Sequence, residues 1–503
     1  MKTLLASILL FWVAIPLSVP AAEPLAELDL SRRLEQLEAE THALRTELET
    51  LRQAPVRLPP IPPADGGLAG LDASGAAPAM PALPSAGGLP EQVAQAPEAA
   101  PAPGLALEAA KAEMKKLVWT KGDFKIVPYG TLWTDMVYAT QRNNPGSYTF
   151  WINSADVDPE DAFAIDARRS RLGFDVTGPD IPLFHCASSS GRVEIDFEGE
   201  FVLENTGSVL LRHAYWQVKD EDFLFLFGQT SDIISPLVPG TLNYSVQWNA
   251  GNIGYRRAQF RAERYYNVSD RLLITAQGSL NQDIVTDFTA EPGVRRESAN
   301  WPVIEGRLAA TLGPRGENCL PAVVGVSGHI GETGFDFLTA GPPPLSLPPQ
   351  QNFRAITWSI NGDVRIPFTP YFGFQGEVFT GENLSAFLGG IGQGVCGCLR
   401  GPVASTGGWM ELWYDWNSRL HSHVGYSIDN PRDEDMLFGR SLNNAVFANV
   451  VYDITPKLNM GFEVSHWRTE YMERRGGLIP DNLLRPDSPG EATIFQWMVM
   501  YGF

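Results

Sequence analysis

The sequence has little cysteine, few basic residues and few long apolar runs. Only 4 of its 503 residues are Cys, too few for a fold held together by disulfides. Beyond the first two dozen residues, no apolar run approaches the roughly 18 residues that a membrane-spanning helix needs. Lys and Arg number 38 against 58 Asp and Glu, for a formal net charge of −20, whereas nucleic-acid binding needs a basic surface. These shortages exclude a disulfide scaffold, a helical membrane protein and a nucleic-acid-binding protein.

The first 22 residues have the pattern of a secretory signal peptide. Lys2 gives the positive start, residues 4–17 form an apolar stretch, and residues 19–22 provide small residues for cleavage. A single anchoring helix is the alternative, but Pro16 and Pro20 interrupt the stretch and no basic stop-transfer segment follows it. We therefore expect residues 1–22 to be removed and the mature chain to leave the cytoplasm.

Residues 23–53 predict a short α-helical coiled coil in the periplasm. The seam alternates spacings of four and three, between flanks of Glu and Arg, at Leu30, Leu34, Leu37, Thr41, Leu44, Leu48 and Leu51. Three heptads are marginal as an isolated helix, so the apolar stripe needs a partner. A lone amphipathic helix lying on another surface is the alternative. The narrow seam and the charged polar faces favour self-association.

Residues 54–104 are rich in Pro, Ala and Gly and contain 12 of the 39 prolines. This composition cannot form a core and predicts a linker. As a flexible coil it would span roughly 40 Å. Residues 105–123 are expected to form a short helical lead-in to the last region of the chain.

From residue 124 to residue 503 the pattern has period two. Between Arg192 and Phe201, every even position is charged and every odd position is apolar or Gly, so such a strand has one face in water and one face against something apolar. Sixteen strands are predicted, at 124–141, 163–178, 191–202, 208–219, 222–230, 255–267, 271–282, 300–313, 321–333, 352–365, 368–381, 406–415, 418–428, 440–453, 457–471 and 492–503.

The connections between these strands largely alternate between tight turns and long loops. Tight turns with long loops, an even strand number and one apolar face are typical of an outer-membrane barrel. Closure into a barrel also satisfies every backbone polar group in lipid. A set of soluble β domains is the alternative, but its strands would be less polar on one face. The fold class predicted is therefore an all-β transmembrane barrel of about 16 antiparallel strands.

The last predicted strand supports a barrel independently. Apolar and aromatic side chains occupy alternate positions up to the C-terminal residue, at Phe495, Trp497, Val499, Tyr501 and Phe503. A terminal Phe with this alternation resembles the signal by which the barrel-assembly machinery recognises outer-membrane proteins. An ordinary half-buried strand is the alternative.

The order of signal, coiled coil, linker and barrel resembles the DcaP-like trimeric porins. The resemblance is concentrated between residues 163 and 266, in segments 169–174 (RSRLGF), 191–200, 211–215 (LRHAY), 227–230 (FGQT) and 257–261 (RAQFR). Phosphate-selective porins share much of this Arg-rich part and are the nearest rival. The resemblance implies a homotrimer, a periplasmic coiled coil and the passage of small, often anionic solutes.

Strand alternation places several arginines in the barrel lumen. Arg169 and Arg171 point inward, where they either contact solutes or pair with carboxylates of the neighbouring strand. Arg257, Gln259 and Arg261 also point inward, and their two neighbouring strands carry no acid. Because planar guanidinium groups suit carboxylate and phosphate, Arg257 and Arg261 are the first candidates for solute contact.

Another inward arginine, Arg307, lies two residues from Glu305 and is expected to pair with it.

The loop at 231–254 is long, and Asp232 is its only charge. Because an exposed loop of this length is ordinarily polar, we expect it to fold into the lumen as a constriction. Packing at a subunit interface is the alternative. Its candidate constriction residues are Pro236, Pro239, Tyr244 and Trp248.

The four cysteines allow two pairings within one subunit. Cys396 and Cys398 share one long loop, whereas Cys186 and Cys319 lie in turns at the opposite end of the barrel. The sequence leaves open which pair is oxidised. Further ligands for a Cys-x-Cys metal site are not evident. His421 and His423 both point inward, but polar lumen histidines are commoner than metal ligands, so no metal and no cofactor is predicted.

Two functions fit these patterns. The first is an outer-membrane porin for passive or substrate-preferring diffusion of small hydrophilic solutes, with anions favoured. The second is a structural barrel whose coiled coil tethers the outer membrane to an envelope layer. An enzyme is not predicted, because no positioned set of nucleophile, base and acid is evident in the sequence.

Overall fold

The computed structural model describes residues 118–184, 187–199, 207–284, 293–316, 319–341, 345–472 and 488–503. The expected signal peptide (1–22), coiled coil (23–53) and linker (54–104) lie outside these residues. Among the described residues, no helix is long and apolar enough to cross a membrane.

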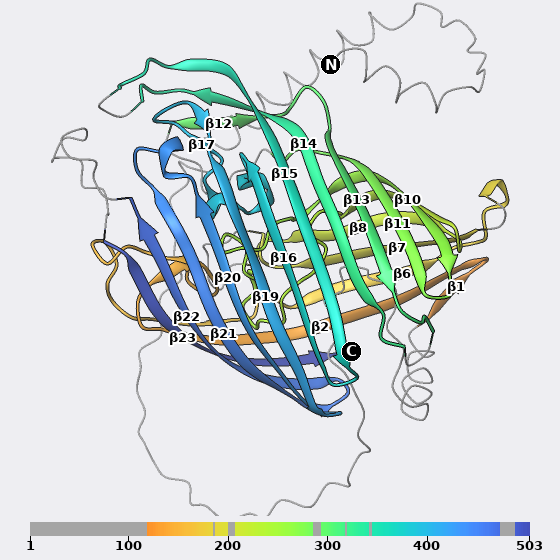
Figure 1. The fold of residues 1–503 in the computed structure, drawn as a ribbon. Coiled ribbons are helices and arrows are strands. Elements are labelled where there is room, and N and C mark those ends of the chain that lie inside the picture. The colour runs from red at the N-terminus through yellow and green to blue at the C-terminus, as the bar shows by residue number, and fades with distance from the viewer. Residues whose placement is uncertain are drawn as a thin grey trace, which may run out of the picture. The chain divides into compact units, whose positions relative to one another are not determined.

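The described residues form a closed barrel of sixteen antiparallel strands (Figure 1). The first wall strand, β2 (Phe124–Ala139), pairs with the last, β23 (Gly490–Gly502), and this pairing closes the barrel. The second wall position is shared by β5 (Ala162–Asp166) and β6 (Arg171–Thr177). The other strands are β7 (Ser188–Asp196), β8 (Leu210–Lys219), β9 (Phe223–Ser231), β10 (Arg256–Ser269), β11 (Leu272–Asn281), β13 (Val303–Leu312), β14 (Ala322–Phe337), β15 (Gln350–Thr369), β16 (Phe372–Glu382), β19 (Ala404–Asn417), β20 (Leu420–Pro431), β21 (Arg440–Thr455) and β22 (Leu458–Tyr471).

Short elements complete the fold. They are β1 (Trp119–Lys121), β3 (Asn143–Pro145), β4 (Thr149–Ile152), β12 (Val294–Glu297), β17 (Val395–Cys396), β18 (Gly401–Pro402) and the 3-10 helices η2 (Pro182–Phe184), η3 (Ser385–Phe387), η4 (Gly390–Gly392) and η5 (Asp433–Asp435). Of these, β1 and β12 extend the barrel sheet by pairing with β2 and β14, respectively.

The period-two pattern of the sequence gives the barrel its two faces. On β10, the side chain of Phe260 is 64% exposed on the outside, whereas its neighbour Gln259 is buried inside. On β6, Leu172 and Phe174 point outward in the same way. The outer face is thus apolar and the inner face polar, as predicted for a barrel that spans a membrane.

Two predicted segments differ from the structure. The end of the expected helical lead-in (105–123) is a strand, because Trp119–Lys121 pairs with β2 through a two-residue turn in which Gly122 has φ +60°. The expected strand 163–178 is interrupted between β5 and β6. There the Arg168 backbone N–H donates to the Asp166 carboxylate at 2.8 Å, and the Trp133 N–H of β2 donates to the Ser170 hydroxyl at 2.9 Å and not to a ladder carbonyl.

The C-terminal residue completes the closure of the barrel. The backbone N–H of Phe503 donates to the Gly130 carbonyl at 3.0 Å, and the Gly130 N–H donates back at 3.3 Å. The Phe503 ring lies where a Cβ on Gly130 would stand. The terminal aromatic is therefore part of the wall as well as a candidate signal for the assembly machinery.

Replacing Phe503 by Asp should impair insertion of the barrel, because a carboxylate would stand on the lipid-facing row beside β2. The measurement is the amount of heat-resistant oligomer on a gel of outer membranes. Phe503→Tyr keeps the ring and is the control. A normal amount of oligomer in the Asp variant would contradict the expectation.

Candidate functional site

Three long loops fold into the barrel lumen. They are the loops at 140–161, 232–255 and 383–403, and their apolar side chains pack together in buried clusters. Loop 232–255 lies between the other two. Asn243 bonds to both backbone groups of Thr149 on one side, and the Asn249 N–H donates to the Leu388 carbonyl at 2.7 Å on the other. The predicted loop at 231–254 thus lies inside the barrel.

Buried glutamates on the wall hold loop 232–255 in place. Four inward carboxylates accept backbone N–H groups of the loop in order along the chain. The pairs are Glu305 of β13 with Ile233 (3.0 Å), Glu377 of β16 with Leu237 (2.7 Å), Glu411 of β19 with Gly240 (2.6 Å) and Glu463 of β22 with Leu242 (2.7 Å). These bonds fix the loop against the wall from β13 to β22.

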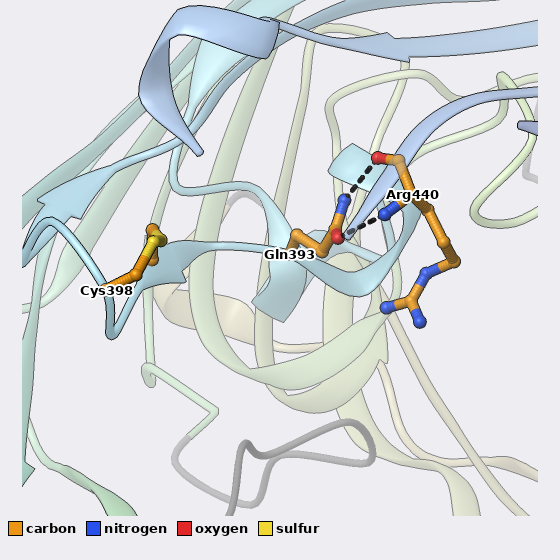
Figure 2. Close-up of a disulfide and its surroundings, with 4 residues drawn as sticks. Gln393, Cys398 and Arg440 are labelled. Atoms are coloured by element: carbon orange, nitrogen blue, oxygen red, sulfur yellow. Dashed lines mark hydrogen bonds between the residues drawn. A yellow bond between two sulfur atoms is a disulfide. The ribbon is translucent and has the colours of Figure 1, made fainter. Parts of the chain in front are cut away.

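Loop 383–403 contains a disulfide. Cys396 and Cys398 are bonded to each other, one of the two pairings that the sequence left open. Figure 2 shows this disulfide together with Gln393, whose side chain donates to the Arg440 carbonyl at 2.7 Å and accepts the Arg440 N–H at 2.8 Å. Cys319 carries a free thiol, and Cys186 lies outside the described residues.

Arg257 has a partner that strand neighbours alone could not reveal. Its Nε donates to the Asp232 carboxylate at 2.8 Å, and its Nη2 donates to the Ala386 carbonyl at 3.0 Å. The expectation that Arg257 faces the lumen freely is therefore wrong, because the only charge of loop 232–255 folds back onto it. Burial raises the pKa of the Asp232 carboxyl, and the charge of Arg257 opposes that rise.

The neighbouring candidates on β10 are also engaged. Arg261 donates to the side chain of Gln259 at 2.9 Å and to the Ser231 carbonyl, and it lies 3.6 Å from Glu263. Gln259 in turn donates to the Thr230 carbonyl at 3.1 Å. The β10 side chains thus stabilise the base of loop 232–255.

The expected pairing of Arg307 with Glu305 is also wrong. Arg307 binds Asp363 of β15 with an N–O distance of 2.6 Å, across the intervening strand β14. Gly325 makes this contact possible, because a Cβ there would meet both side chains. Glu305 is free to accept the loop N–H instead.

The two candidate arginines near the break between β5 and β6, Arg169 and Arg171, differ in their contacts. Arg169 lies 3.7 Å from Asp135 and 3.9 Å above the Trp133 ring centroid, and it donates to the Leu242 carbonyl. Arg171 has no hydrogen-bond or ion-pair partner in the described part of the chain. Arg169 thus holds the loop, whereas Arg171 remains available.

Arg171 lines a cavity of about 130 Å³ between loop 232–255 and the wall formed by β6, β7 and β8. The strands contribute Arg171, Arg192, Glu194, Arg212 and His213. The loop and the start of β10 contribute Pro236, Tyr244, Trp248, Tyr255 and Arg256. Three of the four predicted constriction residues therefore line the cavity, and Pro239 is buried elsewhere in the loop.

Two of the four arginines in this cavity are already neutralised. Arg212 binds Glu194 at 2.6 Å and Asp196 at 2.7 Å, and Arg192 binds Asp175 at 2.7 Å. Arg256 is different, because its guanidinium stands near the rings of Tyr255 and Trp248, at 4.8 and 5.7 Å from the ring centroids, and not beside a carboxylate.

No described residue gives Arg256 a hydrogen bond or an ion pair. The cavity thus contains two cations without a hydrogen-bond or ion-pair partner, Arg171 and Arg256, and Arg171 feels the charge of Glu194, which Arg212 already binds. Sequence reasoning missed Arg256 because strand alternation predicts that it points outward. The available sequence signal for the burial of Arg256 was its position directly after the aromatic Tyr255.

The paired histidines on β20 have different partners. His421 lies 2.7 Å from Asp415 and 3.3 Å from Asp453, whereas His423 lies 3.3 Å from Glu411. Across the described ranges, no group of three His, Cys, Asp or Glu is arranged to hold a metal ion.

The barrel shares its fold with outer-membrane proteins of known structure. Solved structures with a similar fold include the outer-membrane channel DcaP of Acinetobacter baumannii, which is 15% identical, with 76% of this chain and 99% of that chain covered and a TM-score of 0.58. The in-vitro folded OmpT of Vibrio cholerae (12% identity; 77% and 99% covered; TM-score 0.47) and an anion-selective porin from Comamonas acidovorans (10%; 76% and 100%; 0.46) are less similar.

At this level of identity, the likeness to DcaP shows the fold alone. It is consistent with the resemblance to DcaP-like porins that the sequence suggested. No family model and no curated protein sequence matches the chain.

Replacing Glu463 by Leu should loosen loop 232–255, since the Leu242 N–H would lose its acceptor. A buried donor without an acceptor costs about 1–3 kcal/mol. We expect larger fluctuations of single-channel current in a planar bilayer, with the barrel still folded. Glu470→Leu, on the outer face of the same strand, is the control. Current fluctuations equal to those of the unmodified protein would show that Glu463 does not hold the loop.

Proposed function

We propose that the chain is an outer-membrane porin through which small hydrophilic solutes diffuse, with a preference for anions. The observation that carries this proposal is the pair Arg171 and Arg256, two cations without an ion-pair partner in one cavity beside an inward loop. Low-dielectric walls focus the field of such charges on a passing ion. The fold shared with the DcaP channel supports the channel role.

This proposal moves solute contact away from the residues that the sequence favoured. Arg257, Arg261 and Arg307 already bind carboxylates or carbonyls, so their role is to position the loop and the wall. Arg171 keeps its proposed role, and Arg256 joins it.

The apolar outer face supports placement in the outer membrane. The proposal includes a homotrimer, insertion by the barrel-assembly machinery through Phe503, a periplasmic N-terminal segment and no enzymatic activity.

Replacing Arg171 or Arg256 by Gln should shift the reversal potential in a salt gradient toward cations. A unit charge about 7 Å from a passing ion contributes about 0.6 kcal/mol at the dielectric constant of water, so each change should lower the anion preference roughly threefold. The shift should shrink near 1 M salt, where the Debye length is about 3 Å.

Arg264→Gln is the matched control, because Arg264 lies on the outer face of β10. If Arg171→Gln and Arg256→Gln both keep the reversal potential of the unmodified protein at low salt, anion preference does not arise in this cavity.

A tethering role for the coiled coil is the second candidate function. The heptad seam at 23–53 favours it, and the linker at 54–104 would uncouple the coil from the barrel. In this alternative the barrel serves as an anchor, and the coil contacts an envelope layer.

A peptide covering residues 23–53 should self-associate, and Leu37→Asp with Leu44→Asp should abolish this, because both changes place charge in the seam. Sedimentation equilibrium measures the result. A peptide that stays monomeric at high concentration would remove the coiled coil from both candidate functions.

A further inference from the structure

The lumen cavity has two chemically different sides. The strands β6, β7 and β8 present Arg171, Arg192, Arg212 and His213, together with Glu194, whose carboxylate Arg212 binds. Arg256, at the start of β10, lies on this side near His213. The opposite side belongs to loop 232–255, which presents the apolar side chains of Ile234, Leu237, Val238 and Val246 alongside the polar Ser235 and Asn252. A solute in this cavity therefore meets mainly guanidinium groups on one side and, around Leu237 and Val238, hydrocarbon on the other.

Two polar backbone groups of the loop beside the cavity bind the wall strand β16. The Leu237 N–H donates to Glu377 at 2.7 Å, and the Val238 carbonyl accepts a hydrogen bond from Gln375 at 3.0 Å. Both partners stand on β16, on the far wall. Because its backbone is satisfied there, this part of the loop offers a passing solute mainly hydrocarbon.

The cationic side of the cavity contains a buried guanidinium group that lacks an anionic partner. Arg256 is nine-tenths buried, and no hydrogen-bond or ion-pair partner for it exists within the described ranges. A buried guanidinium without a counter-charge is costly, and a planar oxyanion group satisfies it well. Arg171, on the strand side of the same cavity, lacks a partner as well.

We infer that this cavity selects anions that carry their charge at one end and hydrocarbon at the other. The oxyanion group lies toward Arg171 and Arg256, and the apolar body lies against Leu237 and Val238. An anion of equal length with a charge at both ends fits less well, because its second charge would lose water against the apolar loop. The inference rests on the proposed porin function and adds the class of solute to it.

The test is block of chloride current through the full-length protein in a planar bilayer. The probes are acetate, butyrate and hexanoate, with succinate as the four-carbon anion charged at both ends. A fully buried methylene changes affinity by about fourfold. For partial contact we expect roughly a twofold fall in the half-blocking concentration per methylene, and weaker block by succinate than by butyrate.

A nearly isosteric variant isolates the loop surface. Leu237→Asn with Val238→Thr keeps the size of both side chains and the backbone bonds to β16, but it makes the surface polar. It should lose most of the chain-length dependence of block. Val450→Thr, on the outer face of β21, is the control and should change neither the chloride conductance nor the chain-length dependence.

The outcomes separate the two proposals. Block that rises with chain length in the unmodified protein and flattens in the double variant supports the inference. Equal block along the series, or stronger block by succinate than by butyrate, overturns it while leaving an anion-preferring porin in place. A reversal potential without anion preference in potassium chloride alone overturns the proposed function itself.

Discussion

The arrangement of the lumen depends on hydrogen bonds from the backbone of loop 232–255 to buried carboxylates of the wall. The loop has one charged residue and many backbone N–H groups that must be satisfied inside the barrel. Glu305, Glu377, Glu411 and Glu463 supply the acceptors. Acidic residues in the lumen therefore hold a nearly uncharged loop, so an acidic protein can still present a cationic cavity.

The same hydrogen bonds determine which part of the lumen stays open. Because the loop is fixed to the wall from β13 to β22, the cavity remains on the side of β6, β7 and β8. Loop 383–403 also holds loop 232–255 in place. Its carbonyls accept the N–H groups of Asn249 and Gly254 and a hydrogen bond from the side chain of Arg257. Hydrogen bonds therefore join the wall to both loops, and these three parts together fix the position of the cavity.

Period-two alternation and the spacing of turns were enough to predict the sixteen strands and the two faces, and the shortage of charge in loop 231–254 predicted that it folds inward. It could not predict partners that lie across the lumen or beyond a neighbouring strand. Arg257 meets Asp232 because the loop returns to its own base, and Arg307 meets Asp363 because Gly325 leaves room between them. Such contacts depend on loop paths and on missing side chains, which a pattern along one strand does not contain.

The freedom of Arg171 arises from a single irregularity in the sheet. Between β7 and β8, Glu194 pairs with His213 and Ile195 with Leu211, so Arg212 is the extra residue of a β-bulge. A bulge re-aims its side chain, and Arg212 turns inward, where it binds Glu194 and Asp196. The other oxygen of Glu194 accepts the Tyr129 hydroxyl at 2.8 Å, so Glu194 forms no ion pair with Arg171 and acts on it only at longer range. With a regular β8 strand, Arg212 would face outward, Glu194 would be available to Arg171, and the cavity would lose one of its two unpaired cations.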